Sequence, residues 1–93
     1  GKPAEFRIDL PADDLVAARG AYVRWVVAGA NAELRVRCNG RLLPPAHGSG
    51  PFREIAVKPD WLRELNEVVF EAEGWESTTV GTASLLLSFD REP

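Results

Sequence analysis

"ELRVRCNGRLL", residues 33–43, alternates apolar and polar side chains and then reaches an Asn-Gly pair. An extended chain would carry Leu34, Val36 and Cys38 on one face and the charged side chains on the other, which is the pattern of a half-buried strand. Asn and Gly tolerate the positive φ angles that a two-residue hairpin needs. The stretch therefore predicts a strand, a turn at Asn39-Gly40 and a short continuation.

The same period of two recurs along the chain, interrupted by loops rich in Gly and Pro such as "PPAHGSGP", residues 44–51. We expect further strands at residues 5–10, 21–29, 52–57, 67–74 and 83–89. The link Gly29-Ala30-Asn31 is short enough to join the strand before it to the strand after it, so the sequence predicts a hairpin there.

Helical spacing is confined to two short segments. Pro59 suits a first helical position, and Trp61, Leu62 and Leu65 lie on one face of a single turn, which predicts a short helical turn near 59–65. Residues 11–21 predict a loop with one helical turn. Neither segment is long enough for the crossover helix of a parallel sheet, so the strands are expected to be antiparallel.

Short strands at this spacing indicate an all-β fold, an antiparallel, jelly-roll-like β-sandwich of about six to eight strands. We expect one domain over residues 1–93, excised from a larger protein. Trp61 is expected to pack its side chain into the core and not to serve as a ligand platform. Other residues expected between the sheets are Trp25, Leu34, Val36, Phe70, Leu85, Leu87 and Phe89.

Composition excludes several classes of protein. The net charge is -3, and a general affinity for nucleic acid or anionic membrane needs a basic excess. No apolar run approaches the roughly 20 residues of a membrane span, and the first residues lack the layout of a signal peptide. The single cysteine and the single histidine exclude an internal disulfide and a Cys/His zinc cluster of the usual ligand count.

The order of the elements resembles the galactose-binding-like jelly-roll superfamily. The matching pieces are Asn39-Gly40 at a strand end, the strand at 55–57 leading into the turn at 61–65, Asn66 opening a strand to Ala72, and a closing strand at 85–89. The resemblance implies an accessory module of a carbohydrate-active enzyme. Such modules bind sugar, brace a catalytic domain or bind other proteins, and fold analogy alone does not choose among these.

The chain offers little for catalysis or metal binding. The one imidazole, His47, lies in the loop at 44–51, whereas a general base needs a fixed position. We therefore expect no enzyme activity and no cofactor. Asp13 and Asp14 could supply carboxylates to a structural calcium, or they could simply favour the positive end of a helical turn, so no metal ligand is assigned.

Sugar binding needs an aromatic platform beside polar groups. Trp75, in the polar loop at 74–81, is the first candidate, with Glu76, Arg41 and His47 as polar contacts, and Tyr22 is a second platform. The alternative for Trp75 is that it caps the sandwich or packs against a neighbouring domain.

The sequence thus predicts a non-catalytic accessory module with weak carbohydrate binding. The alternative is a structural or protein-docking domain without a ligand, for which Val26, Val69 and Leu86 would form an apolar outer patch. The expected partner is a glycan or a neighbouring domain of the parent protein, with no nucleic acid and no membrane span.

Overall fold

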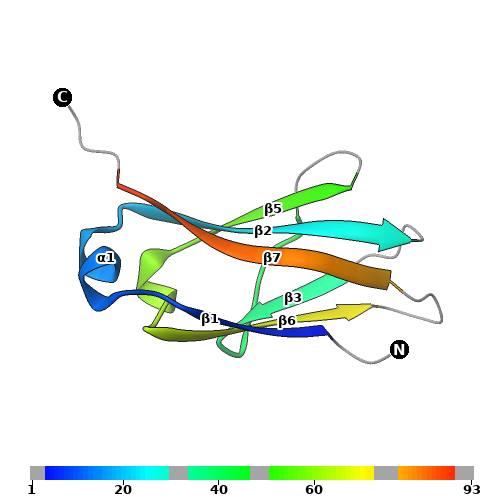
Figure 1. Ribbon diagram of the computed structural model, residues 1–93, viewed down its shortest axis with the longest axis horizontal. Helices are drawn as coiled ribbons and strands as arrows, with labels where there is room; N and C mark the ends of the chain where they lie inside the picture. Colours follow the sequence, from blue (N-terminus) through cyan, green and yellow to red (C-terminus); the bar gives the residue numbers. More distant parts are fainter. Residues whose placement is uncertain (1–3, 30–33, 47–50, 73–77, 90–93) are drawn as a thin grey trace.

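The structure is a computed structural model that describes residues 4–29, 34–46, 51–72 and 78–89. Within these ranges the chain forms two antiparallel sheets, with strand orders β1-β6-β3-β4 and β5-β2-β7 (Figure 1). The prediction of an all-β sandwich is confirmed. The elements are β1 (Ala4–Asp9), α1 (Ala12–Ala17), β2 (Gly20–Gly29), β3 (Leu34–Cys38), β4 (Arg41–Leu42), β5 (Phe52–Val57), the 3₁₀ turn η1 (Pro59–Trp61), β6 (Leu65–Ala72) and β7 (Thr78–Ser88).

The turn between β3 and β4 is a two-residue hairpin. Cys38 and Arg41 are paired, and the residues between them have positive φ angles, 52° at Asn39 and 84° at Gly40. Positive φ at both central residues matches the right-handed twist of the flanking strands. The predicted turn and its short continuation are confirmed.

The predicted hairpin between β2 and β3 is wrong. β2 pairs with β5 and β7, whereas β3 pairs with β6 and β4, so the chain passes from one sheet to the other between them. Burial explains the difference, because the apolar faces of both strands enter one core from opposite sheets. Trp25 of β2 packs on Phe70 of β6, with ring centroids 5.0 Å apart.

The core lies between the inward faces of the two sheets, as the period of two predicts. Trp25, Val36 and Phe70 are at most 3% exposed, and the expected core leucines Leu34, Leu85 and Leu87 are partly buried against them. Phe6 adds an edge-to-face contact on Phe70, with centroids 5.6 Å apart. Phe89 was expected in the core and is 44% exposed, because β7 ends one residue before it.

The helical turn predicted near 59–65 is shorter than expected. Leu62 donates its N–H to the carbonyl of Pro59 and is already in an extended conformation. Leu62 is buried and Trp61 packs partly buried against the core, as expected. Leu65 is 59% exposed, contrary to expectation, because it opens β6 and the inward position falls to Asn66. Among the described helices, none is long and apolar enough to cross a membrane.

Candidate functional site

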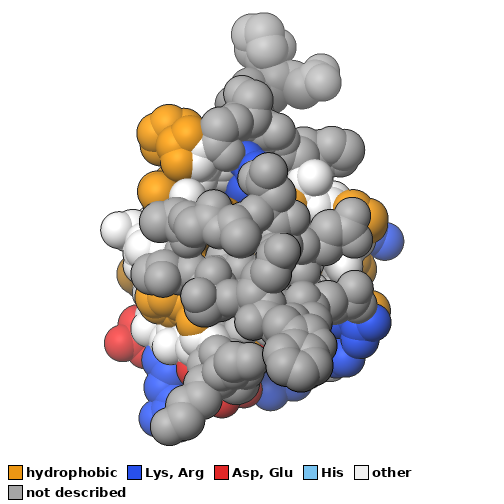
Figure 2. Space-filling model, turned by 90° about the vertical axis from the view of Figure 1, so that its right-hand side faces the viewer, with side chains coloured by type: hydrophobic (Ala, Val, Ile, Leu, Met, Phe, Trp, Pro, Cys, Tyr) orange, Lys and Arg blue, Asp and Glu red, His pale blue; other side chains and the backbone are white. Residues whose placement is uncertain are grey.

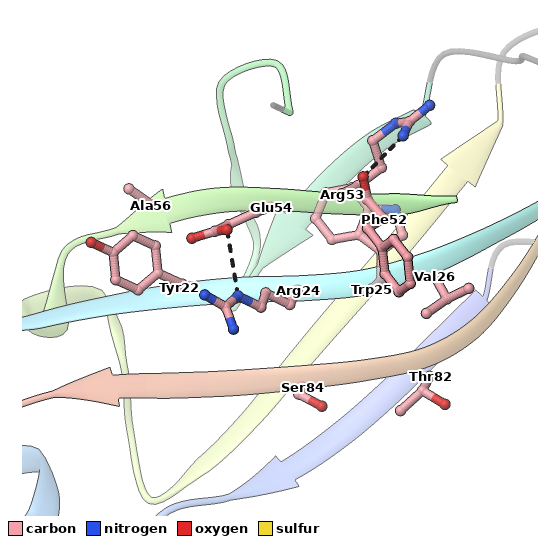
Figure 3. Close-up of a pocket in the computed structure, with 10 residues that line it drawn as sticks. All are labelled: Tyr22, Arg24, Trp25, Val26, Phe52, Arg53, Glu54, Ala56, Thr82 and Ser84. Atoms are coloured by element: carbon pink, nitrogen blue, oxygen red, sulfur yellow. Dashed lines mark hydrogen bonds and ion pairs between the residues drawn. The ribbon is translucent and has the colours of Figure 1, made fainter. Parts of the chain in front are cut away.

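The outer face of the three-stranded sheet is hollowed into an open groove of about 810 Å³ (Figure 3). All three strands contribute outward side chains. Those with aromatic or polar groups are Tyr22 and Arg24 of β2, Phe52 and Glu54 of β5, and Thr82 and Ser84 of β7.

Strand register brings these side chains together. Arg24 and Val26 of β2 are opposite Glu54 and Phe52 of β5, respectively. On the other side of β2, Arg24 is opposite Ser84 of β7. Because alternate residues of a strand point to the same face, the residues two positions apart line the same groove. The groove is therefore a direct product of the alternation that also builds the core.

Two aromatic rings stand at different points along the groove. Tyr22 is 37% exposed and Phe52 is 66% exposed. Phe52 lies opposite Val26, four residues beyond Tyr22 on β2, which corresponds to roughly 13 Å along the strand. The groove thus has two apolar platforms separated by more than the width of one sugar ring.

An ion pair lies between the two platforms. Arg24 Nε is 3.4 Å from Glu54 Oε2, and the two side chains are 57% and 39% exposed. An exposed pair of this kind contributes only about 0 to 1 kcal/mol to stability. The fold does not depend on it, and a guanidinium and a carboxylate still have hydrogen-bonding capacity toward a ligand after one mutual contact.

This arrangement offers the groups that a carbohydrate-binding surface uses. Aromatic faces pack against the apolar faces of pyranose rings, while flanking charged and hydroxyl groups can bond to sugar hydroxyls. Glycoside hydrolysis usually needs two carboxyl groups across the scissile bond. Of the described residues that line the groove, Glu54 alone carries a carboxylate.

The structure places the predicted site residues in different locations. Trp75, Glu76 and His47 lie outside the described residues. Arg41 is on β4 in the other sheet, where its guanidinium carbon is 4.6 Å from the centre of the Trp61 ring and thus contributes nothing to the groove. Tyr22, the second predicted platform, does line the groove.

Sequence reasoning did not assign a binding role to Arg24, Phe52 or Glu54. Their outward orientation is visible in the alternation of "AYVRWVVAG" and "FREIAV". The missing information was the register of β2 against β5, which brings residues about thirty positions apart to one surface.

The apolar outer patch predicted from Val26, Val69 and Leu86 does not form. Val26 and Leu86 are on the three-stranded sheet, whereas Val69 is on β6 of the four-stranded sheet, so the two groups face opposite directions. The side of the molecule that carries the four-stranded sheet bears charged side chains of both signs, at the bottom of Figure 2. A cross-strand ion pair lies there, with Arg37 Nε 3.8 Å from Glu71 Oε1.

Asp13 and Asp14 are exposed in the first turn of α1. No group of three or more His, Cys, Asp or Glu side chains that could hold a metal ion occurs within the described ranges. Within the part of the chain that the structure describes, no third side chain of these types joins Asp13 and Asp14 to form a calcium site.

Comparison with known proteins gives no match, because no protein-family model, no curated protein and no solved structure is significantly similar to this chain. The groove on β5, β2 and β7 is accordingly the basis for assigning a function.

Proposed function

We propose that this domain is a non-catalytic accessory module that binds carbohydrate weakly, as part of a larger carbohydrate-active protein. The observation that carries the proposal is the groove of the three-stranded sheet, where Tyr22 and Phe52 stand exposed on either side of the Arg24–Glu54 pair. The resemblance to galactose-binding-like jelly rolls supports the same class of function.

The geometry favours an oligosaccharide over a single sugar. Two platforms roughly 13 Å apart along the strand can each stack on a different ring of one chain. Arg24 and Glu54 neutralise each other, and their planar groups can each form paired hydrogen bonds with vicinal hydroxyls. A shallow, open groove holds few buried contacts, so the affinity is expected to be low.

A glycan array with the 93-residue chain tests the proposal, followed by NMR titration with the oligosaccharides that score. We expect Tyr22→Ala and Phe52→Ala each to weaken binding by about tenfold or more. Each variant removes an aromatic face on which a sugar ring packs, and the comparable stacking of a nucleic-acid base on one aromatic ring is worth on the order of 1 to 3 kcal/mol. Phe89→Ala is the matched control, because Phe89 is an exposed aromatic residue outside the groove.

Two outcomes would contradict the proposal. If no glycan binds, the result favours the alternative, a structural or protein-docking domain without a ligand of its own. If binding is unchanged by both groove variants and abolished by Trp75→Ala, the ligand binds at the loop predicted from the sequence and not in the groove.

A further inference from the structure

We propose that the domain self-associates through the free edge of β7, so that two copies form one continuous six-stranded sheet. The proposal concerns a different surface from the groove and does not depend on sugar binding. In the described part of the chain, β7 pairs with β2 on one side only, over Thr78–Ser88. Its other side is therefore a sheet edge.

β7 lacks the protection that the other edges carry. Natural edge strands are usually blunted by charge, proline or short length. β1 has Glu5, Arg7 and Asp9. β5 begins directly after Pro51 and has Arg53 and Glu54, and β4 is two residues long and includes Arg41. In contrast, residues 78–89 contain neither a charged residue nor a proline.

The second half of β7 is the segment available for pairing. A register shift between Trp25 and Val27 disrupts the ladder at Gly81 and Thr82 of β7, while the pairing from Ala83 to Ser88 is regular. Along this regular part Leu85, Leu86 and Leu87 are all only partly buried. A further strand beside them would cover apolar surface that one chain leaves accessible to water.

A second copy of this chain fits the edge because the segment is complementary to itself. An antiparallel pair related by a two-fold axis through Leu86 puts Leu86 opposite Leu86 of the second copy. It also puts Leu85 opposite Leu87 and Ser84 opposite Ser88, with facing side chains on the same side of the sheet. No like charges meet, and the interface closes on itself after two copies.

The association would have a consequence for the groove. A two-fold axis perpendicular to the sheet keeps the outer faces of both copies on the same side. In this register Ser84, which lines the groove on β7, lies opposite Ser88 of the second copy and four residues along the strand from its own equivalent. The two grooves would therefore open on the same side of the six-stranded sheet and be displaced along it by roughly 13 Å or more. A glycan with several binding sites could then be held by both copies at once.

Sedimentation velocity over a concentration series tests the proposal. We expect the mass to rise from 10.2 kDa toward twice that value and then stop. Leu86→Lys should weaken association by about tenfold or more, because two lysines would meet at the axis and apolar contact would be lost. Leu65→Lys is the matched control, since Leu65 is 59% exposed on an interior strand of the other sheet.

Charge complementation identifies the register. An equal mixture of Leu86→Lys and Leu86→Glu should associate more tightly than either variant alone, because opposite charges then meet at the axis. In the unchanged protein, hydrogen exchange of β7 amides should slow as concentration rises. The proposal would be refuted if the protein kept the mass of a single chain at all concentrations, and the β7 edge would then be available to a strand of another protein. It would also be refuted if Leu65→Lys weakened association as much as Leu86→Lys does, or if the mixture of the two Leu86 variants associated no more tightly than either variant alone.

Discussion

The side-chain amide of Asn39 donates a hydrogen bond of 2.9 Å to the side-chain oxygen of Asn66, 27 residues further along the chain. Asn39 belongs to the β3–β4 turn and Asn66 to the start of β6. The second Nδ2 hydrogen of Asn39 bonds to the carbonyl of Trp61, and its Oδ1 accepts from the N–H of Glu67. This pair therefore fastens the turn to the η1–β6 segment.

Asn66 is fully buried and all four of its hydrogen-bonding positions are used. Its Oδ1 also accepts from the N–H of Arg63 at 2.8 Å, and its Nδ2 donates to the carbonyls of Arg63 and Ile8. A buried amide with complete partners fixes the positions of the backbones that it joins. Here it links β1, η1, β6 and the β3–β4 turn at one end of the four-stranded sheet.

Asn66→Ala is expected to lower the free energy of unfolding by about 2 to 4 kcal/mol, because the buried groups of Asn39, Arg63 and Ile8 would lose their partner. Urea denaturation measures the loss. Leu65→Ala, a change in the exposed neighbouring residue, should stay within about 0.5 kcal/mol. The double-mutant cycle of Asn39→Ala with Asn66→Ala should give a coupling of about 1 kcal/mol, and additivity would show that the pair does not act together.

Trp25→Ala is expected to cost about 3 to 5 kcal/mol, the range for emptying a large aromatic site. Trp25 is 3% exposed and links the two sheets through Phe70. Chemical denaturation with fluorescence of the remaining tryptophans provides the measurement. Phe89→Ala should change stability by less than about 0.5 kcal/mol, because Phe89 is substantially exposed. Similar losses in both variants would place Phe89 in the core after all.

Gly40→Ala should lower stability, whereas Gly20→Ala should not. Gly40 has a φ of +84°, so an added Cβ would cost about 1 kcal/mol through backbone strain, although it would meet no other atom. At Gly20 an added Cβ would lie 3.7 Å from Cβ of Ser88, an ordinary contact. Alanine there restricts the unfolded chain and should be neutral or stabilise by up to about 1 kcal/mol. Thermal unfolding of both variants decides the matter, and destabilisation at both positions would contradict the argument.

Cys38 should make stability fall in alkaline solution. Burial raises the pKa of the Cys38 thiol above its ordinary value. Below about pH 8.5, the usual thiol pKa, both folded and unfolded chains keep the proton. As the pH rises further the unfolded chain releases it first, so stability is lost progressively toward the higher pKa of the folded state. The buried, protonated thiol should also react slowly with thiol reagents under native conditions.

Urea midpoints measured from pH 7 to 9.5 test this expectation. Cys38→Ala is the control, because it lacks the titrating group while sharing every other one. The unchanged protein should lose more stability over this interval than the variant does. Equal slopes would mean that the thiol does not contribute to the pH dependence.

Much of the fold could be predicted from local pattern. The alternation of Leu34, Val36 and Cys38 gave the buried face of β3, and Asn39-Gly40 gave its turn. The errors concern the ends and partners of elements. Leu65 was assigned to a helical face that does not exist, because the buried hydrogen bonds of Asn66 fix the start of β6.

The candidate site was less predictable than the fold. Tyr22 was recognised as an outward aromatic residue, but its association with Phe52 and with the Arg24–Glu54 pair depends on how β2 and β5 align. The residues of β2 and β5 are far apart in the chain, and nothing in the composition of either strand specifies the register between them.

The sequence by itself determined which face of each strand is apolar and where the chain can turn, because both are properties of a few consecutive residues. Only the tertiary structure decided that β2 separates from β3 to pair with β5 and β7. That choice depends on burying Trp25 against Phe70 across the sandwich, a gain that comes from contact between segments distant in the chain. The groove, the β7 edge and the Asn39–Asn66 link are all consequences of it.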